Sequence, residues 1–106
     1  MVGGIYFIDM PYSDFRQYKA RPILVFKLID KDDMLVLPLT TNLQRDGIII
    51  TNQNLTMGSL KKESVVIIPK ITAIDSSLIS ESNKIAHLKD DVFEMVSNEI
   101  CKKLNC

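Results

Sequence analysis

The most informative residue for chemistry in this chain is an arginine at the start of an apolar segment. Arg21 is the last polar residue before the run Pro22-Ile23-Leu24-Val25-Phe26. Proline fixes its own φ and disfavours a helical conformation in the residue before it, so Arg21 is expected to lie extended at the mouth of a buried strand. A guanidinium keeps its charge near neutral pH and can stabilise a phosphate or an oxyanion. Arg21 is therefore the main candidate for a site residue.

The remaining reactive residue types do not form a recognisable constellation. The single histidine, His87, lies in an apolar context and is assigned a structural role, which excludes a two-histidine acid–base pair. Cys101 and Cys106 have no histidine nearby, so a thiol nucleophile is not expected, and both are predicted to be free thiols. The aspartate pairs are interpreted as a turn (32–33) and a helix start (90–91). With no glycine-rich phosphate loop and no ligand cluster, no cofactor and no metal are expected.

A threonine is the best partner for Arg21. Thr40 and Thr41 end the apolar segment 34–39, and residues 30–33 are polar enough to form a turn after 22–29. If the two segments form an antiparallel hairpin, Arg21 and Thr40 lie at the same end of the sheet. Such a pair can stabilise a phosphorane-like transition state and orient a hydroxyl, but it supplies no strong base. It suits a reaction whose nucleophile belongs to the substrate, as the 2′-hydroxyl of RNA does. The alternative is that Arg21 is a surface residue and that the threonines only end a strand.

These residues must be positioned by a mostly β chain. Alternating and apolar runs predict strands over residues 5–10, 22–29, 34–39, 47–51, 64–69, 71–74 and 84–88. Pro38 predicts a bulge or a strand end. Weak helical or turn character is expected over 52–62, and a capped single turn over 75–80. Residues 12–20 are interpreted as a polar loop.

A helix is predicted over residues 90–104. Acidic residues in its first turns and lysines in its last suit the helix dipole, and one apolar stripe is formed by Val92, Met95, Val96, Ile100 and Leu104. The expected fold is therefore mostly β with α, a small antiparallel curled sheet or barrel with a C-terminal helix. Residues 1–106 are interpreted as a single domain with one core.

Composition narrows the possible partners and the location. Thirteen basic and thirteen acidic residues cancel, so any nucleic-acid contact must come from a local patch. No segment contains the roughly 18 to 20 apolar residues that span a bilayer, and no signal-peptide pattern opens the chain. The protein is expected to be cytoplasmic, without a membrane partner.

Several segments, taken in order, resemble the MazF/PemK-like toxins of type II toxin–antitoxin systems. They are residues 4–14 (GIYFIDMPYSD), 21–25 (RPILV), 37–42 (LPLTTN), 60–66 (LKKESVV), 71–75 (ITAID) and 84–88 (KIAHL). The resemblance implies an SH3-like barrel with a C-terminal helix and a homodimer. It also implies a metal-independent endoribonuclease that cuts single-stranded RNA and leaves a 2′,3′-cyclic phosphate and a 5′-hydroxyl.

The resemblance also implies roles for individual residues. Arg21 and Thr40 would be catalytic, and the RNA-binding residues would be Ser13, Asp14, Arg16, Lys19, Thr41 and Asn42. The partner would be an antitoxin whose disordered C-terminal segment folds into the same groove. Thr72 and Leu78 stand where many members carry arginine, which implies fewer phosphate contacts.

A non-catalytic function is the alternative. The same fold serves CcdB-like toxins, which act on gyrase through protein contacts at the end of the C-terminal helix, here residues 101–106. An inactive protein that only binds an antitoxin is a further possibility. Truncation of these last residues separates the hypotheses, because it should spare RNA cleavage and abolish a toxicity that depends on protein binding.

Overall fold

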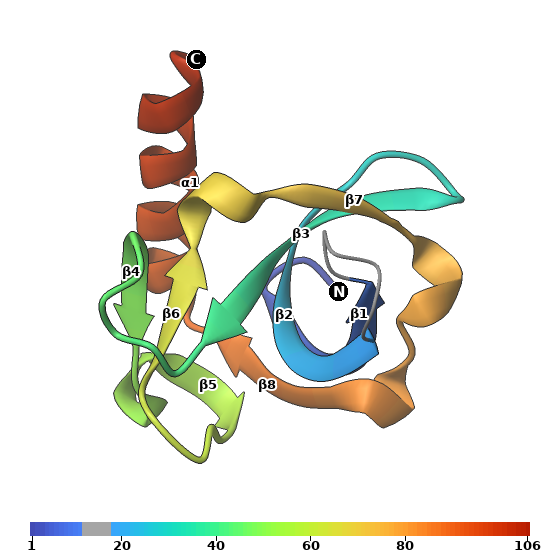
Figure 1. Cartoon of the computed structure of the whole chain (residues 1–106), viewed down its shortest axis with the longest axis horizontal. Coiled ribbons are helices and arrows are strands. Elements are labelled where there is room, and N and C mark those ends of the chain that lie inside the picture. The colour runs from blue at the N-terminus through green and yellow to red at the C-terminus, as the bar shows by residue number, and fades with distance from the viewer. Residues whose placement is uncertain (12–17) are drawn as a thin grey trace.

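Short antiparallel strands and one helix make up the protein (Figure 1), in a computed structural model that describes residues 1–11 and 18–106. The strands are β1 (Gly4–Pro11), β2 (Tyr18–Leu28), β3 (Asp33–Thr40), β4 (Gly47–Ile50), β5 (Leu55–Gly58), β6 (Ser64–Ile67), β7 (Thr72–Asp75) and β8 (Lys84–Leu88). The helix α1 spans Asp90–Leu104, and short 3₁₀ turns cover Asn52–Asn54, Ile68–Lys70, Ser76–Leu78 and Glu81–Asn83. The prediction of a mostly β chain with a C-terminal helix is confirmed.

The strands form one curled sheet in the order β4-β6-β3-β2-β1-β8-β5, with antiparallel pairing throughout. One edge of β3 is shared by two partners. Its first half, Asp33–Val36, pairs with β7, and its last residues, Leu39 and Thr40, pair with β6. Because β6 and β7 diverge from this shared edge, the sheet bends into a half-barrel, with α1 beside β4 and β6 (Figure 1).

The strand that follows Arg21 is buried on both faces, as predicted. Ile23, Leu24 and Val25 are fully buried in β2, which lies between β1 and β3. Alternation sends Leu24 into the hydrophobic cluster beneath α1 and the other two side chains into a second cluster, with Met34 and Ile74. The expectation of one core was therefore wrong, because a curled sheet has two faces to cover.

The hairpin of β2 and β3 is confirmed, and its turn is held by one carboxylate. The Asp30 side chain accepts hydrogen bonds from the backbone N–H groups of Asp32 and Asp33, each at 2.8 Å. The predicted irregularity at Pro38 was wrong, since β3 continues through it, and the bulge lies at Phe26 in β2. Pro38 pairs with Ile23 of β2, and on the other edge of β3 it lies between the residues that pair with β7 and those that pair with β6.

The prediction of helical or turn character over residues 52–62 is confirmed at Asn52–Asn54, which form a 3₁₀ turn. It was wrong for Leu55–Gly58, which form the edge strand β5 and pair with β8. Strand propensity depends on the neighbour more than on local sequence, so this pairing was not visible in the segment alone. Gly58 ends the strand with a φ of +74°, and a Cβ there would meet the carbonyl oxygen of Ile85 and the Cα of Ala86.

The substitution Gly58→Ala is therefore expected to destabilise the protein by more than about 1 kcal/mol, because it adds both a left-handed alanine and a backbone clash. Chemical denaturation measured by circular dichroism checks this. Ser59→Ala, at the exposed neighbouring position, is the control and should change the unfolding free energy by less than about 0.5 kcal/mol. Equal midpoints for the two variants would contradict the expectation.

The helix has the predicted bounds but a narrower apolar face. Val92, Val96 and Ile100 are buried against the sheet, whereas Met95 and Leu104 are 55% and 60% exposed. The predicted apolar stripe is therefore buried at three of its five residues. Met95 lies off the row of residues spaced by four that packs on the sheet, and Leu104, the last residue of α1, continues that row but is exposed. On the same helix, Phe93 packs against Phe26 of β2 with ring centroids 5.9 Å apart.

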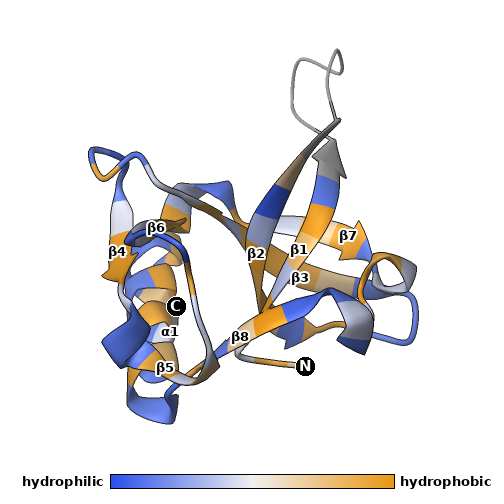
Figure 2. Cartoon of the chain, turned by 90° about the horizontal axis from the view of Figure 1, so that it is seen from below, coloured by the Kyte–Doolittle hydropathy of each residue, from blue (hydrophilic) through white to orange (hydrophobic). Residues whose placement is uncertain are grey.

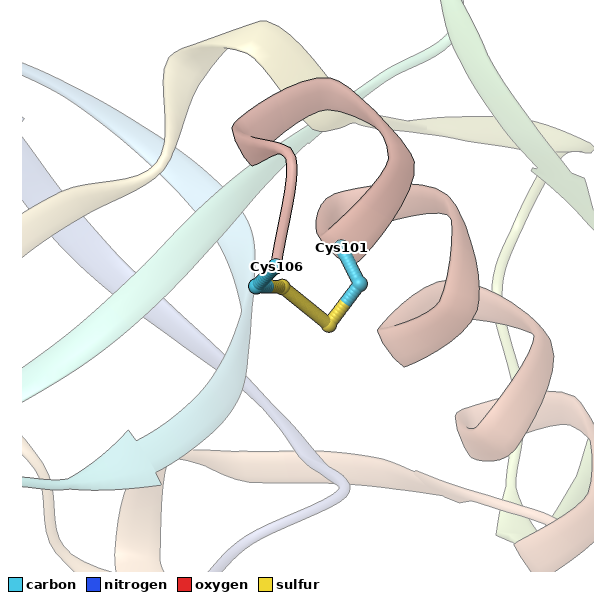
Figure 3. The surroundings of a disulfide bond; sticks show 2 residues. All are labelled: Cys101 and Cys106. Carbon is cyan, nitrogen blue, oxygen red and sulfur yellow. A yellow bond between two sulfur atoms is a disulfide. The ribbon is translucent and has the colours of Figure 1, made fainter.

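The C-terminal cysteines form a disulfide, contrary to the prediction of two free thiols (Figure 3). Asn105 ends the helix in the left-handed conformation and turns the chain back, so that the Cys106 N–H donates to the Cys101 carbonyl at 3.0 Å. The two Cα atoms are 4.9 Å apart, within the range that a disulfide can bridge. Sequence separation alone did not reveal this turn.

Candidate functional site

A pocket of about 250 Å³ lies at the end of the sheet where β2 begins and β3 ends. It is lined by Ala20, Arg21, Pro22, Leu39, Thr40, Thr41 and Ser64. The hairpin thus brings Arg21 and Thr40 to one pocket, as the sequence predicted.

Arg21 is positioned by the pairing of β1 with β2. It is half-buried, lies opposite Ile8 of β1, and is followed by the buried residues of β2. The strand pairing fixes the backbone of Arg21 at the pocket that its side chain lines. The outer ends of β1 and β2 extend away from the rest of the sheet as a hairpin (Figure 2), so Arg21 lies at the base of that hairpin.

Thr40 is half-buried and keeps a proton to donate. Its Oγ1 accepts a hydrogen bond from the backbone N–H of Asn42 at 3.2 Å, and the Asn42 side-chain oxygen accepts one from the N–H of Gln44 at 3.1 Å. These bonds fix the turn after β3 and use a lone pair of the Thr40 oxygen, while its hydrogen can be donated to a ligand. Thr41 is exposed at the rim of the pocket, whereas Asn42 does not line it.

Ser64 was missed by the sequence prediction. It is the first residue of β6, is only 4% exposed, and joins the site because β6 pairs with the end of β3. Its hydroxyl donates to the Lys62 carbonyl at 3.1 Å, which ties the pocket to the loop before β6. The sequence predicted a strand that starts at Ser64. Nothing in the sequence indicated that this strand pairs with the end of β3.

The structure describes no side chain for the remaining four residues that are predicted to bind RNA. Ser13, Asp14 and Arg16 lie outside the described residues, and of Lys19 only the backbone is described, paired with Met10 in β1. Thr72 and Leu78 are exposed on β7 and in the following turn, and neither lines the pocket.

His87 has a structural environment, as predicted. It is half-buried in β8 and packs against Gly3, where an added Cβ would lie 3.1 Å from its Nε2. Burial lowers the pKa of His87, and the charges of Lys84 and the N-terminus lower it further. The imidazole does not line the Arg21 pocket.

The pH dependence of stability should follow from this lowered pKa. An unfolded chain binds a proton at His87 near pH 6.5, whereas the folded chain binds it only at lower pH, so stability should fall as pH drops below about 6.5. Denaturant titrations at pH 7.5 and 5.5 measure the change. His87→Gln should reduce the loss between these two pH values, and an unchanged loss would assign it to other groups.

Two further findings concern metals and membranes. Within residues 1–11 and 18–106, no three or more His, Cys, Asp or Glu side chains gather where they could hold a metal ion. In the same described part, no helix is both long and apolar enough to cross a membrane.

The fold and the site define a small antiparallel half-barrel with a C-terminal helix and with an arginine and hydroxyl groups in a pocket at one end. The sequence model of the PemK-like, MazF-like toxins of type II toxin–antitoxin systems matches residues 1–104, and the chain belongs to this family. No curated protein sequence matches it.

Solved structures support the fold assignment. The Mycobacterium tuberculosis toxin MazF-mt6 superposes with a TM-score of 0.71 at 19% identity, covering 96% of each chain. A MazE-MazF complex from Deinococcus radiodurans superposes with a TM-score of 0.70 at 18% identity, covering 98% of this chain and 94% of the other. At these identities the likeness is one of fold.

Proposed function

We propose that this toxin is a metal-independent endoribonuclease that cuts single-stranded RNA, such as mRNA, by attack of the RNA's own 2′-hydroxyl. The observation that carries the proposal is the presence of Arg21 and Thr40 in one pocket. Family membership supports a toxin of a toxin–antitoxin system. The pocket offers a fixed positive charge and hydroxyl donors, which are groups that stabilise a phosphate as its charge develops.

The reaction needs only groups that this pocket, the substrate and water supply. The 2′-oxygen loses its proton to solvent and bonds to phosphorus, while the bond from phosphorus to the 5′-oxygen breaks. Arg21 stabilises the charged phosphate oxygens and helps protonation of the leaving 5′-oxygen by hydrogen-bonding it, while the proton itself comes from water because the guanidinium keeps its own. Thr40 donates a hydrogen bond from its hydroxyl to a phosphate oxygen and thereby holds the phosphate in line for attack. The products are a 2′,3′-cyclic phosphate and a 5′-hydroxyl.

The biological partners belong to the same proposal. An antitoxin would neutralise the protein in the cytoplasm by placing a segment over the pocket, as suits a member of this toxin family. A Deinococcus radiodurans relative of the same fold was solved as a MazE-MazF complex. A homodimer is proposed as the active form, with Thr41 and Asn42 beside the bound RNA. RNA binding by Ser13, Asp14, Arg16 and Lys19 stays a prediction.

The test is incubation of the purified protein with single-stranded RNA in EDTA, followed by mapping of both new ends. Cleavage in EDTA with cyclic phosphate and 5′-hydroxyl ends is expected. Thr40→Val, which keeps the shape and removes the hydroxyl, should slow cleavage strongly. A 5′-phosphate product, or the wild-type rate in the Thr40 variant, would overturn this assignment.

A second candidate function is that of a toxin that acts by protein contacts at the end of α1, residues 101–106. Leu104 in this segment is 60% exposed, so its side chain is accessible to a protein target. Under this alternative the protein is toxic without cutting RNA. Leu104→Asp should then abolish toxicity in cells, whereas under the endoribonuclease proposal it should leave RNA cleavage unchanged.

A further inference from the structure

We propose that a second pocket beside the Arg21 pocket is a subsite for the RNA backbone and an adjacent base, some nucleotides away from the cleaved bond. The inference rests on the proposed function. The pocket has a volume of about 400 Å³. Its polar lining comes from two loops, and consists of Thr51, Asn52, Gln53, Lys61, Lys62 and Glu63.

The second pocket is built on fixed backbone. The Asn52 side-chain oxygen accepts a hydrogen bond from the Leu60 N–H at 2.8 Å, which joins the two loops across the pocket. The Asn54 side chain accepts one from the Thr51 N–H, also at 2.8 Å. Leu60 is buried in the hydrophobic cluster beneath α1. The two lysines are therefore carried by an anchored loop.

The two pockets lie at the same end of the sheet, on either side of the start of β6. Ser64 lines the Arg21 pocket and pairs with Ile50 of β4. The residue after Ile50 is Thr51, which lines the second pocket. On the other side, Val65 pairs with Thr40. Two strand spacings, about 10 Å, thus separate the pockets. At roughly 3.4 Å or more per nucleotide, a strand of about three nucleotides bridges that distance.

The lining suits RNA better than an acidic peptide. Lys61 and Lys62 are exposed and supply two positive charges for phosphates. The amide groups of Asn52 and Gln53 can donate to and accept from base edges, and the Glu63 carboxylate can accept from a base amino group, which an acidic peptide does not offer. Glu63 of this pocket and Ser64 of the Arg21 pocket are neighbours in the chain, so one RNA strand can contact both pockets.

The first test measures binding of a single-stranded RNA with 2′-O-methyl groups, which cannot be cut, over a series of salt concentrations. Each lost phosphate contact reduces the slope of log K against log salt by about 0.7 for a single strand, so K61A/K62A should be less steep by about 1.4. The matched control is K27A/K31A, two exposed lysines near the opposite end of the β2–β3 hairpin, which should keep the wild-type slope. A wild-type slope in K61A/K62A would overturn the subsite.

A second test separates failure of the subsite from failure of the proposed function. If wild-type protein cuts RNA but K61A/K62A cuts long and very short RNAs at wild-type rates, the subsite is wrong and the function stands. If wild-type protein cuts nothing yet binds the methylated RNA through Lys61 and Lys62, the subsite stands and the endoribonuclease is wrong. Loss of affinity for an acidic peptide, with RNA binding unchanged, would assign the pocket to a protein partner and overturn the proposal.

Discussion

The substitution Arg21→Ala should reduce RNA cleavage by about 10²-fold or more, which corresponds to about 2.7 kcal/mol of lost transition-state stabilisation. Arg21 lies at the start of β2 in the pocket that also contains Thr40, and no neighbouring side chain in that lining carries a second positive charge. The loss should appear in kcat under saturating RNA, since the charge is needed most when the phosphate carries five oxygens. Single-turnover cleavage of a short RNA measures it.

Two comparisons make this expectation specific to the site. Arg21→Lys should recover part of the rate, because it keeps the charge and loses the planar, paired donors of the guanidinium. Arg45→Ala removes an exposed arginine in the loop between β3 and β4 and should cut RNA at nearly the wild-type rate. If the Arg21 variant cuts as fast as the Arg45 variant while both remain folded, the proposed catalytic role is wrong.

The substitution Leu24→Ala should lower the free energy of unfolding by about 2–5 kcal/mol. Leu24 is fully buried in β2 and belongs to the cluster that joins the sheet to α1. Truncation loses the transfer free energy of its side chain and leaves a cavity between two elements that cannot easily close around it. Because small domains are stable by only about 5–15 kcal/mol, this is a large share of the total.

Chemical denaturation with a matched control checks the second expectation. Leu28→Ala changes the same residue type on the same strand, but Leu28 is 46% exposed and its truncation should cost less than about 1 kcal/mol. The denaturation midpoint should therefore separate the two variants clearly. Similar midpoints would mean that the cluster beneath α1 contributes less than its burial indicates.

The parts of the structure that sequence could predict are those fixed by neighbours along the chain. The β2–β3 hairpin follows from two apolar segments and a short polar turn, and this hairpin alone predicts that Arg21 and Thr40 lie at the same end of the sheet. The helix likewise follows from its own spacing. These elements are local, so their residues contain most of the information that determines them.

The features that sequence missed depend on contacts between distant segments. Ser64 enters the site only because β6 pairs with the end of β3, and β5 is a strand only because β8 lies beside it. The disulfide required a left-handed Asn105, a single backbone angle that composition does not reveal. Propensity and spacing describe one segment at a time, so they do not predict which strands will pair in the tertiary fold.

The turn at Asp30 has a consequence at the far end of the hairpin. Ile23, Leu24 and Val25 are apolar and buried on both faces, so a shift of β2 by one residue would still bury apolar side chains, and hydrophobicity alone does not prevent it. The Asp30 hydrogen bonds and the bulge at Phe26 instead decide which residues face each other. A register shift of one residue would move Arg21 away from Thr40 in an otherwise folded molecule. The surface turn at Asp30 therefore determines the geometry of a pocket that it does not contact.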